Sequence, residues 1–243
     1  MSAPLRILIS GQHGQVSQAL QQSLKDLGEL IVLGREQLDL SRPESIGEVV
    51  RRIQPDLIIN AAAHTAVDQA ESEPDLAFAI NATSPGVFAQ EAAALGIPFI
   101  HYSTDYVFDG SKDGTWNEHD APNPLGVYGK SKLAGEQAIT AAGGQSLILR
   151  TSWVYSLTGR NFLLTMQRLL QEREKLTIVA DQIGAPTWAG TIAQSTRQLI
   201  ERWREGRPGA WGVYHLTASG ETSWFGFAQA IGEQLVKDGK PCA

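Results

Sequence analysis

Short apolar runs alternate with helix-like stretches over most of the chain. Runs typical of buried strands lie at residues 5–10, 30–33, 57–60, 98–103 and 147–150. Helical periodicity follows the first run, with apolar residues at 16, 20, 24 and 27, and further helical stretches lie at 75–95 and 133–142. This alternation predicts an α/β fold in which helices cover both faces of a parallel sheet.

The pattern is less regular after residue 150, where further strand-like runs lie at 176–180 and 213–216. A chain of 243 residues with 42% hydrophobic content can bury one sizeable core. We therefore expect one compact unit, in which the later residues add the remaining strands and a small lobe.

A glycine turn follows the first strand, in the segment Gly11-Gln12-His13-Gly14-Gln15-Val16-Ser17. Strand, glycine turn and helix is the arrangement that binds a pyrophosphate on free backbone N–H groups at a helix N-terminus. The pattern here is G-x-x-G-x-x-S, which is shorter than the full dinucleotide fingerprint, so a plain connecting turn is the alternative.

The second strand is followed by Gly34 and Arg35, where many dinucleotide-binding folds place an acid on the ribose 2′-hydroxyl. A guanidinium at this point suits a 2′-phosphate, which favours NADPH over NADH. NADH stays open, because Arg35 can instead be a solvated loop residue with Glu36 in place of the acid.

Small and polar residues follow two further strands. Ala61 to Thr65 come after the strand at 57–60, and Thr104 and Asp105 end the run that begins at residue 98. Ligands of open α/β sheets bind at the carboxyl ends of the strands. A lone loop histidine is more often structural than catalytic, so we expect His64 to make a backbone contact with a cofactor.

Tyr128 and Lys132 are four residues apart in PLGVYGKSKLAGEQA, and this spacing places them on one face of a helix. We expect the ammonium to lower the tyrosine pKa from about 10, so that the pair can exchange protons with an alcohol or carbonyl. By itself the spacing is also common on surface helices.

Trp153 falls just beyond the strand at 147–150, where an indole can pack against the apolar face of a sugar. Three other tryptophans are expected to be core or surface anchors: Trp203, Trp211 and Trp224.

A net charge of −6 argues against a nucleic-acid surface, which needs a basic stripe. No apolar stretch is long enough to span a membrane. The single cysteine, Cys242, excludes an intrachain disulfide, and the first strand begins at residue 5, which predicts no signal peptide. We therefore expect a cytoplasmic protein.

The motifs together resemble the dTDP-4-dehydrorhamnose reductase family, an extended branch of the short-chain dehydrogenases/reductases. The resemblance covers residues 6 to about 235 and is carried by GQV after the glycine turn and by NAAAHTAVDQAE, INATS, HYSTDYVFDG, PLGVYGKSKLAGE, RTSWVY and DQIGAPT. It implies NAD(P)H-dependent reduction of the C4 ketone of dTDP-4-dehydro-L-rhamnose. The implied fold is a Rossmann-type doubly wound sheet, with a dinucleotide-binding core at 1–150 and a small, incomplete substrate lobe within 151–243.

The resemblance also assigns roles to residues of this sequence. The implied catalytic residues are Thr104, Tyr128 and Lys132. The implied substrate contacts are Thr104, Asp105 and Trp153. The residues expected along the cofactor are Gly11, Gly14, Gln15, Val16, Arg35, Asp39, Leu40, Ala63, His64, Thr65, Tyr128 and Lys132.

The chain departs from the family pattern at two points. Family members continue with an RPxNS segment that closes over the substrate, whereas this chain ends at Ala243, so we expect an incomplete substrate lobe. Some members hold a magnesium-bridged dimer through an acid that is Gly190 here, so we predict no metal site. A homodimer stays open.

Two alternatives to the reductase remain open. The first is a non-catalytic NADP-binding protein of the same fold, like the regulatory subunit of methionine adenosyltransferase. The second is a reductase or epimerase for another nucleotide sugar.

Overall fold

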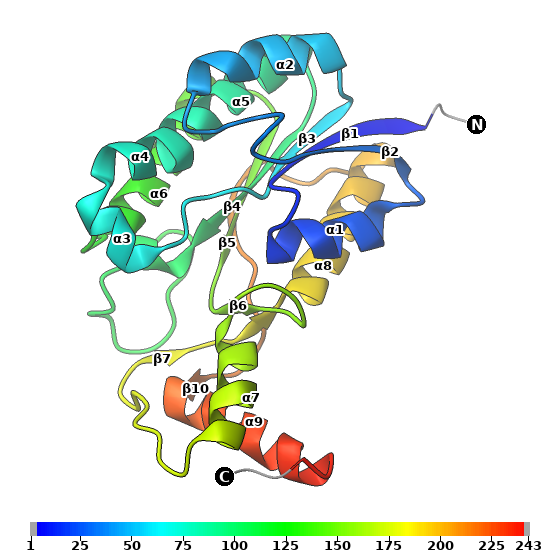
Figure 1. Ribbon diagram of the computed structural model, residues 1–243. Helices are drawn as coiled ribbons and strands as arrows, with labels where there is room; N and C mark the ends of the chain where they lie inside the picture. Colours follow the sequence, from blue (N-terminus) through cyan, green and yellow to red (C-terminus); the bar gives the residue numbers. More distant parts are fainter. Residues whose placement is uncertain (1–3, 241–243) are drawn as a thin grey trace.

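A six-stranded parallel sheet forms the centre of the computed structural model, which describes residues 4–240. Cys242 lies outside the described residues. The strand order is β2-β1-β3-β4-β5-β9 (Figure 1). The strands are β1 (Leu5–Ser10), β2 (Gly28–Leu33), β3 (Leu57–Asn60), β4 (Phe99–Thr104), β5 (Ser146–Thr151) and β9 (Gly212–His215). The expected doubly wound α/β sheet is therefore confirmed.

Helices cover both faces of the sheet (Figure 1). Alternate residues of β1 show how the two faces are filled, because Ile7 and Ile9 enter one buried cluster and Leu8 enters the other. The first cluster includes residues of α1 (Gln15–Leu24) and α8 (Ala189–Arg204). The second includes residues of α2 (Ile46–Ile53), α5 (Ser84–Leu95) and α6 (Val127–Ala142).

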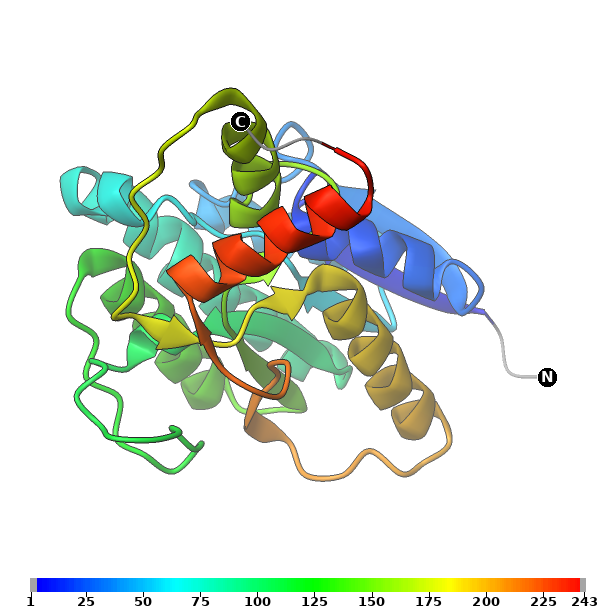
Figure 2. The same cartoon turned by 90° about the horizontal axis from the view of Figure 1, so that it is seen from below.

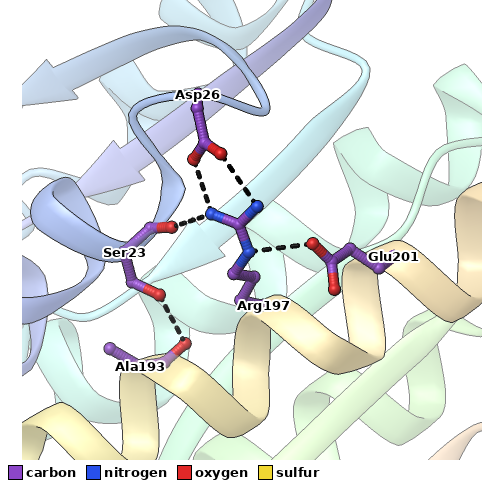
Figure 3. Close-up of polar contacts among 5 residues, drawn as sticks. All are labelled: Ser23, Asp26, Ala193, Arg197 and Glu201. Carbon is purple, nitrogen blue, oxygen red and sulfur yellow. Dashed lines mark hydrogen bonds and ion pairs between the residues drawn. The ribbon is translucent and has the colours of Figure 1, made fainter.

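The packing of α1 against α8 is held by Arg197 (Figure 3). Its guanidinium forms two bonds to Asp26, at 2.5 and 2.9 Å, and donates to the carbonyl of Ser23 at 2.6 Å and to Glu201 at 2.8 Å. Ser23 Oγ in turn donates to the carbonyl of Ala193 at 3.4 Å. These contacts fix α1, whose N-terminus is the glycine turn.

The continuous helix expected at 75–95 is interrupted. The chain instead forms α3 (Val67–Ser72), α4 (Pro74–Phe78), a π-helical turn at Ala79–Thr83 and then α5. Pro85 has no N–H to donate to the carbonyl of Asn81, which removes one α-helical bond at this point. π turns of this kind are frequent at functional sites.

A small lobe lies beyond the carboxyl ends of the central strands (Figures 1 and 2). It contains the strand pairs β6 (Val154–Tyr155) with β8 (Thr187–Trp188) and β7 (Ile183–Gly184) with β10 (Thr222–Ser223). Its helices, α7 (Phe162–Glu172) and α9 (Trp224–Lys237), enclose a separate cluster of four buried side chains: Met166, Ala228, Ile231 and Leu235.

The strand expected at 176–180 does not form, and these residues run as a loop. One backbone bond, from Phe225 N to the carbonyl of Val179, ties this loop to the start of α9. The run at 213–216 does form a strand, which is β9 at the edge of the sheet.

Candidate active site

A cleft of about 650 Å³ opens between the carboxyl ends of the central strands and the small lobe. The end of the cleft nearest the glycine turn brings together seven of the residues expected along the cofactor: Gly11, Gly14, Gln15, Val16, Arg35, Ala63 and Thr65. The other end brings together Thr104, Asp105, Tyr128, Lys132 and Trp153.

The glycine turn has the geometry that a pyrophosphate requires. Gly11 has φ +90°, and a Cβ on it would lie 3.0 Å from atoms of Ala62, so this position needs glycine. Gly14 caps α1 with extended backbone and no side-chain hydrogen bond to the first turn. The first N–H groups of the helix are therefore left for a ligand, and the residues present fit a phosphate group here.

Gln15 connects this turn to the small lobe. Its Oε1 accepts from Ser156 Oγ at 3.0 Å and from Asn161 Nδ2 at 2.8 Å. Asn161 also caps α7 by accepting from Leu164 N at 3.0 Å. The start of α1 and the start of α7 are thus fixed to each other across one end of the cleft.

Arg35 lies at the cleft with an exposed side chain, and its Nε is 3.6 Å from Asp39 Oδ1. Asp39 also accepts from the hydroxyl and the backbone N–H of Ser41, and these bonds lower its pKa. The structure does not bring Asp39 or Leu40 to the cleft wall. Leu40 is buried in the core, and its carbonyl accepts from Ser84 Oγ at 2.7 Å.

His64 is also outside the cleft wall. Asn81 accepts from His64 N at 2.8 Å and donates to His64 O at 3.0 Å, which holds this backbone segment in place. The imidazole Nε2 lies 3.6 Å from Glu73. Asn81 comes from the π turn and was missed by the sequence reasoning, because the turn itself was not predicted.

Thr104 and Tyr128 both line the end of the cleft away from the glycine turn. Thr104 ends β4, and Tyr128 lies in the first turn of α6. Thr104 Oγ1 also donates to Asp105 Oδ1 at 3.0 Å and accepts from Tyr106 N at 3.2 Å. The ring of Tyr106 packs edge-on against Tyr128, with centroids 5.4 Å apart.

Two glycines allow α6 to approach closely enough for this contact. A Cβ on Gly129 would lie 2.2 Å from the carbonyl oxygen of Tyr106, and one on Gly135 would lie 2.1 Å from that of Asn81. Neither position can carry a side chain without movement of the backbone. The glycines in YGKSKLAGE therefore determine how closely α6, the helix that carries Tyr128 and Lys132, packs against its neighbours.

The pKa of Tyr128 moves in the direction opposite to the one expected from the sequence. Burial raises it to about 12, and the interaction with Thr104 only partly opposes this. Lys132 does not offset the burial, because its Nζ donates to the carbonyl of Tyr102 at 2.6 Å. The phenol is therefore a neutral proton donor at pH 7.

Two other groups at this end have shifted pKa values. Burial lowers the pKa of Lys132 to about 8, opposed by the charge of Glu136. Burial raises the pKa of Asp105 to about 6, opposed by the hydrogen bond from Thr104. Shifts of this size, gathered in a cleft, are typical of sites that move protons.

The small lobe contributes a pair of stacked tryptophans. Trp153 has φ +45° and stacks on Trp224, with ring centroids 3.5 Å apart and planes 9° from parallel. Gly184 makes room for the pair, since a Cβ on it would lie 2.5 Å from the indole of Trp153. Trp224 also lines the cleft, although its sequence context indicated only a core or surface anchor.

Comparison with known proteins identifies the family to which this site belongs. The family model described as RmlD substrate binding domain matches residues 5–243. The chain belongs to this family. Within residues 4–240, no helix is long and apolar enough to cross a membrane.

The RmlD relatives cover nearly all of the chain. It is 49% identical to a dTDP-4-dehydrorhamnose reductase of Escherichia coli (strain K12), over 98% of this chain and 81% of the relative. It is also 49% identical to one of Burkholderia thailandensis, over 93% of this chain and 77% of the relative. These relatives are therefore longer than this chain.

A solved structure shares the fold. The dTDP-4-dehydrorhamnose reductase of Bacillus anthracis, in complex with NADP, superposes with a TM-score of 0.90 at 36% identity. The match covers 98% of this chain and 82% of that one.

Proposed function

We propose that this chain catalyses NADPH-dependent reduction of the C4 ketone of dTDP-4-dehydro-L-rhamnose, giving dTDP-L-rhamnose. Relatives at 49% identity are named dTDP-4-dehydrorhamnose reductases. The observation that carries the proposal is that Tyr128 and Thr104 line the same cleft as the glycine turn. One group can supply a proton and the other can orient a carbonyl at the end of a dinucleotide site.

The cofactor, when bound, supplies the hydride that reduces the ketone. In our proposal the first-turn N–H groups of α1 hold its pyrophosphate, with Gly11 and Gly14 allowing the backbone to approach closely. Arg35 pairs with the 2′-phosphate through charge-assisted bonds. Lys132 holds the ribose hydroxyls near the reacting carbon.

Tyr128 gives its proton to the oxygen of the former ketone, and Thr104 donates a hydrogen bond to the same oxygen. A positioned proton donor contributes roughly 10²–10⁴-fold to a rate. A donor aimed at the developing negative charge contributes on the order of 10²–10³-fold. Thr104 can do this by exchanging its present bond to Asp105 for one to the substrate.

We also propose a division of labour between the two walls of the cleft. Residues 1–150 hold the cofactor, and residues 151–243 contribute the sugar-binding surface, with Trp153 packing against the deoxysugar. In this proposal Asp105, whose raised pKa lets it hold a proton close to neutral pH, meets a sugar hydroxyl.

The proposal is tested by following NADPH absorbance with dTDP-4-dehydrorhamnose and this chain. We expect turnover that Tyr128→Phe reduces by about 10²-fold or more, with the dissociation constant for NADPH unchanged. NADPH binding without turnover in the unaltered chain would instead favour a non-catalytic NADP-binding protein. Turnover with a different nucleotide sugar alone would favour another reductase or epimerase of this fold.

The role of Arg35 has its own test. Arg35→Ala removes the charge proposed to meet the 2′-phosphate, so NADPH should bind roughly tenfold more weakly while NADH binding changes little. Equal losses for the two cofactors would remove this role from Arg35. Arg160, which also lines the cleft, would then be the next residue to substitute.

A cytoplasmic location and a homodimer are two further parts of the proposal. Cell fractionation followed by an activity assay tests the location. Sedimentation velocity at micromolar concentration tests the assembly.

A further inference from the structure

A row of buried polar side chains crosses three neighbouring strands under the cleft and ends at Lys132. Ser10, Asn60 and His101 occupy matching positions on β1, β3 and β4, because Ser10 pairs with Asn60 and Asn60 pairs with His101 in the strand register. Their exposed fractions are 2%, 1% and 0%. Buried polar groups are costly unless they are hydrogen-bonded, so the direction of each bond carries information.

The first bonds fix the orientation of the Asn60 amide. Its Oδ1 accepts from Ser10 Oγ at 2.5 Å and from Ala62 N at 3.2 Å. Because the backbone N–H of Ala62 can only donate, the oxygen of the amide must face these two partners. The Nδ2 group then faces His101 Nδ1, at 3.1 Å.

This orientation assigns the proton of the imidazole. Nδ1 of His101 accepts from Asn60, so a neutral ring carries its proton on Nε2. Nε2 lies 3.3 Å from Lys132 Nζ. The other partner of Nζ is the carbonyl of Tyr102, at 2.6 Å.

The contact with His101 distinguishes the two protonation states of Lys132. An ammonium has three donors and no acceptor, so it would meet the Nε2–H group donor to donor. A neutral amine has a lone pair that accepts from Nε2–H while an amine N–H donates to Tyr102 O. The row of side chains therefore favours the neutral amine.

The charged groups around Lys132 do not reverse this preference. Glu136 on the same helix favours the ammonium, but its carboxylate is bonded to Arg150 of β5 at 2.6 and 2.9 Å. Burial and the charge of Lys132 hold the pKa of His101 well below its ordinary value, so this ring is neutral where Lys132 titrates. Tyr102, Tyr106, Tyr128 and Asp105 are further titratable groups that line this end of the cleft.

We propose that His101 is a positioning residue which, held with its proton on Nε2 by Asn60, orients Lys132 and stabilises its neutral amine. The consequence for catalysis rests on the proposed function: a lysine that exchanges its proton close to neutral pH can return a proton to Tyr128 between turnovers. The physical claim about Lys132 does not depend on that function.

The first test uses the unaltered chain without cofactor or substrate. The protein has five histidines, so a two-bond ¹H–¹⁵N spectrum of histidine-labelled protein can resolve their tautomers. The His101 signals are assigned by their loss in His101→Gln. We expect a neutral ring with its proton on Nε2 at pH 7. Through-bond correlation of each imidazole to its own backbone amide assigns the same signals without any variant. A proton on Nδ1, or a ring that is charged at pH 7, would overturn the proposal.

The second test measures Lys132 directly by the ¹³Cε shifts of lysine-labelled protein, again without ligands. The chain contains seven lysines, and Lys132→Met assigns the signal. His101→Gln can present a carbonyl oxygen to the ammonium, so the pKa of Lys132 should rise by about one unit, a tenfold shift in its proton equilibrium. The exposed His119 provides the matched control, since His119→Gln should leave this titration unchanged.

The third measurement connects the physical claim to the reaction. In the profile of kcat against pH, the limb that reports the titration of Lys132 should shift to higher pH in His101→Gln. The dissociation constant for NADPH should stay within about threefold of that of the unaltered chain. A titration of Lys132 that is unchanged in a folded His101→Gln protein contradicts the proposal. A shifted titration with no turnover in any protein contradicts only the reductase assignment.

Discussion

The two walls of the cleft are built differently. The core wall contains polar groups that are buried and paired, and the ion pair between Arg150 and Glu136 is only 6% and 4% exposed. The wall from the small lobe has two-residue strands and four buried apolar side chains of its own, and the ion pair between Arg168 and Glu172 on α7 is 62% and 52% exposed.

This difference separates two tasks of the site. Proton transfer needs groups held within a fraction of an ångström, and the core wall holds Tyr128 and Lys132 on a helix that glycines set against the sheet. Segments with few buried contacts open locally at a lower free energy than the core does. Under the proposed function, the small lobe is therefore the part that adjusts to a sugar. Matched substitutions in the two walls should have unequal effects.

The largest expected effect comes from the buried ion pair. Glu136 accepts from Arg150 and also from Ser103 Oγ at 2.5 Å, so Glu136→Gln leaves the guanidinium as an uncompensated buried charge. We expect a loss of about 3–5 kcal/mol in the free energy of unfolding. Urea denaturation followed by circular dichroism measures it.

The exposed pair on α7 is the control for this change. Glu172→Gln removes one partner of an i,i+4 pair in solvent, and we expect a loss below about 0.5 kcal/mol. Comparable losses in the free energy of unfolding for Glu136→Gln and Glu172→Gln would show that the core wall is not more tightly held than the wall from the small lobe.

A second comparison uses a small residue that the core wall requires. Gly135→Ala would place a Cβ 2.1 Å from the carbonyl oxygen of Asn81, so either α6 or the π turn must shift. We expect a loss of about 2–3 kcal/mol in the free energy of unfolding and a fall in kcat, because the helix also carries Tyr128. A melting temperature equal to that of the unaltered chain would contradict this account of the helix depth.

Much of the fold could be predicted because its strands are buried on both faces. Continuous apolar runs such as 57–60 are typical of central strands of a parallel sheet, which are buried on both faces. The glycine after the first strand indicates the turn into α1. The break at Ala79–Thr83 was not predicted, and the strand that was predicted at 176–180 does not form. Both depend on tertiary contacts, such as those of Asn81 with His64, that have no local pattern.

The site shows the same limit. The positions of Thr104, Tyr128 and Lys132 at one end of the cleft followed from strand ends and helix spacing, but the pKa of Tyr128 did not. Its direction is set by the burial of the phenol, and Lys132, whose Nζ donates to a carbonyl of β4, does not offset that burial. Trp224 was missed because its stacking on Trp153 depends on the strands β7 and β10 meeting across about forty residues.

The third expected effect is a gain in stability that depends on pH. The pKa of Asp105 is raised to about 6, so the folded state binds its proton more tightly than the unfolded chain does. The free energy of unfolding therefore falls as the pH rises from about 4 to about 6, and the penalty persists above that range. Asp105→Asn keeps an acceptor for Thr104 and removes the charge.

This substitution should stabilise the chain at pH 7 by roughly 1–3 kcal/mol, and the gain should disappear below about pH 4. Denaturation curves at pH 4 and pH 7 measure the difference. We also expect Asp105→Asn to lower kcat, because a change that stabilises the proposed reacting end of the cleft should reduce activity. A gain of equal size at both pH values would show that it does not come from the carboxyl group.

The smallest expected effect uses the same glycine-to-alanine change in the small lobe. Gly232 lies inside α9, and a Cβ on it would lie 3.6 Å from Leu170 Cδ1, which is ordinary van der Waals contact. Gly232→Ala should therefore raise the free energy of unfolding by about 0.5–1 kcal/mol, because alanine has the higher helix propensity. The sign is opposite to that expected for Gly135→Ala, although both residues lie within helices. A loss above 1 kcal/mol in the free energy of unfolding of Gly232→Ala would mean that α7 and α9 are packed as tightly as the core wall. The part of the small lobe that we propose to adjust to a sugar would then have to be the loops that join these helices.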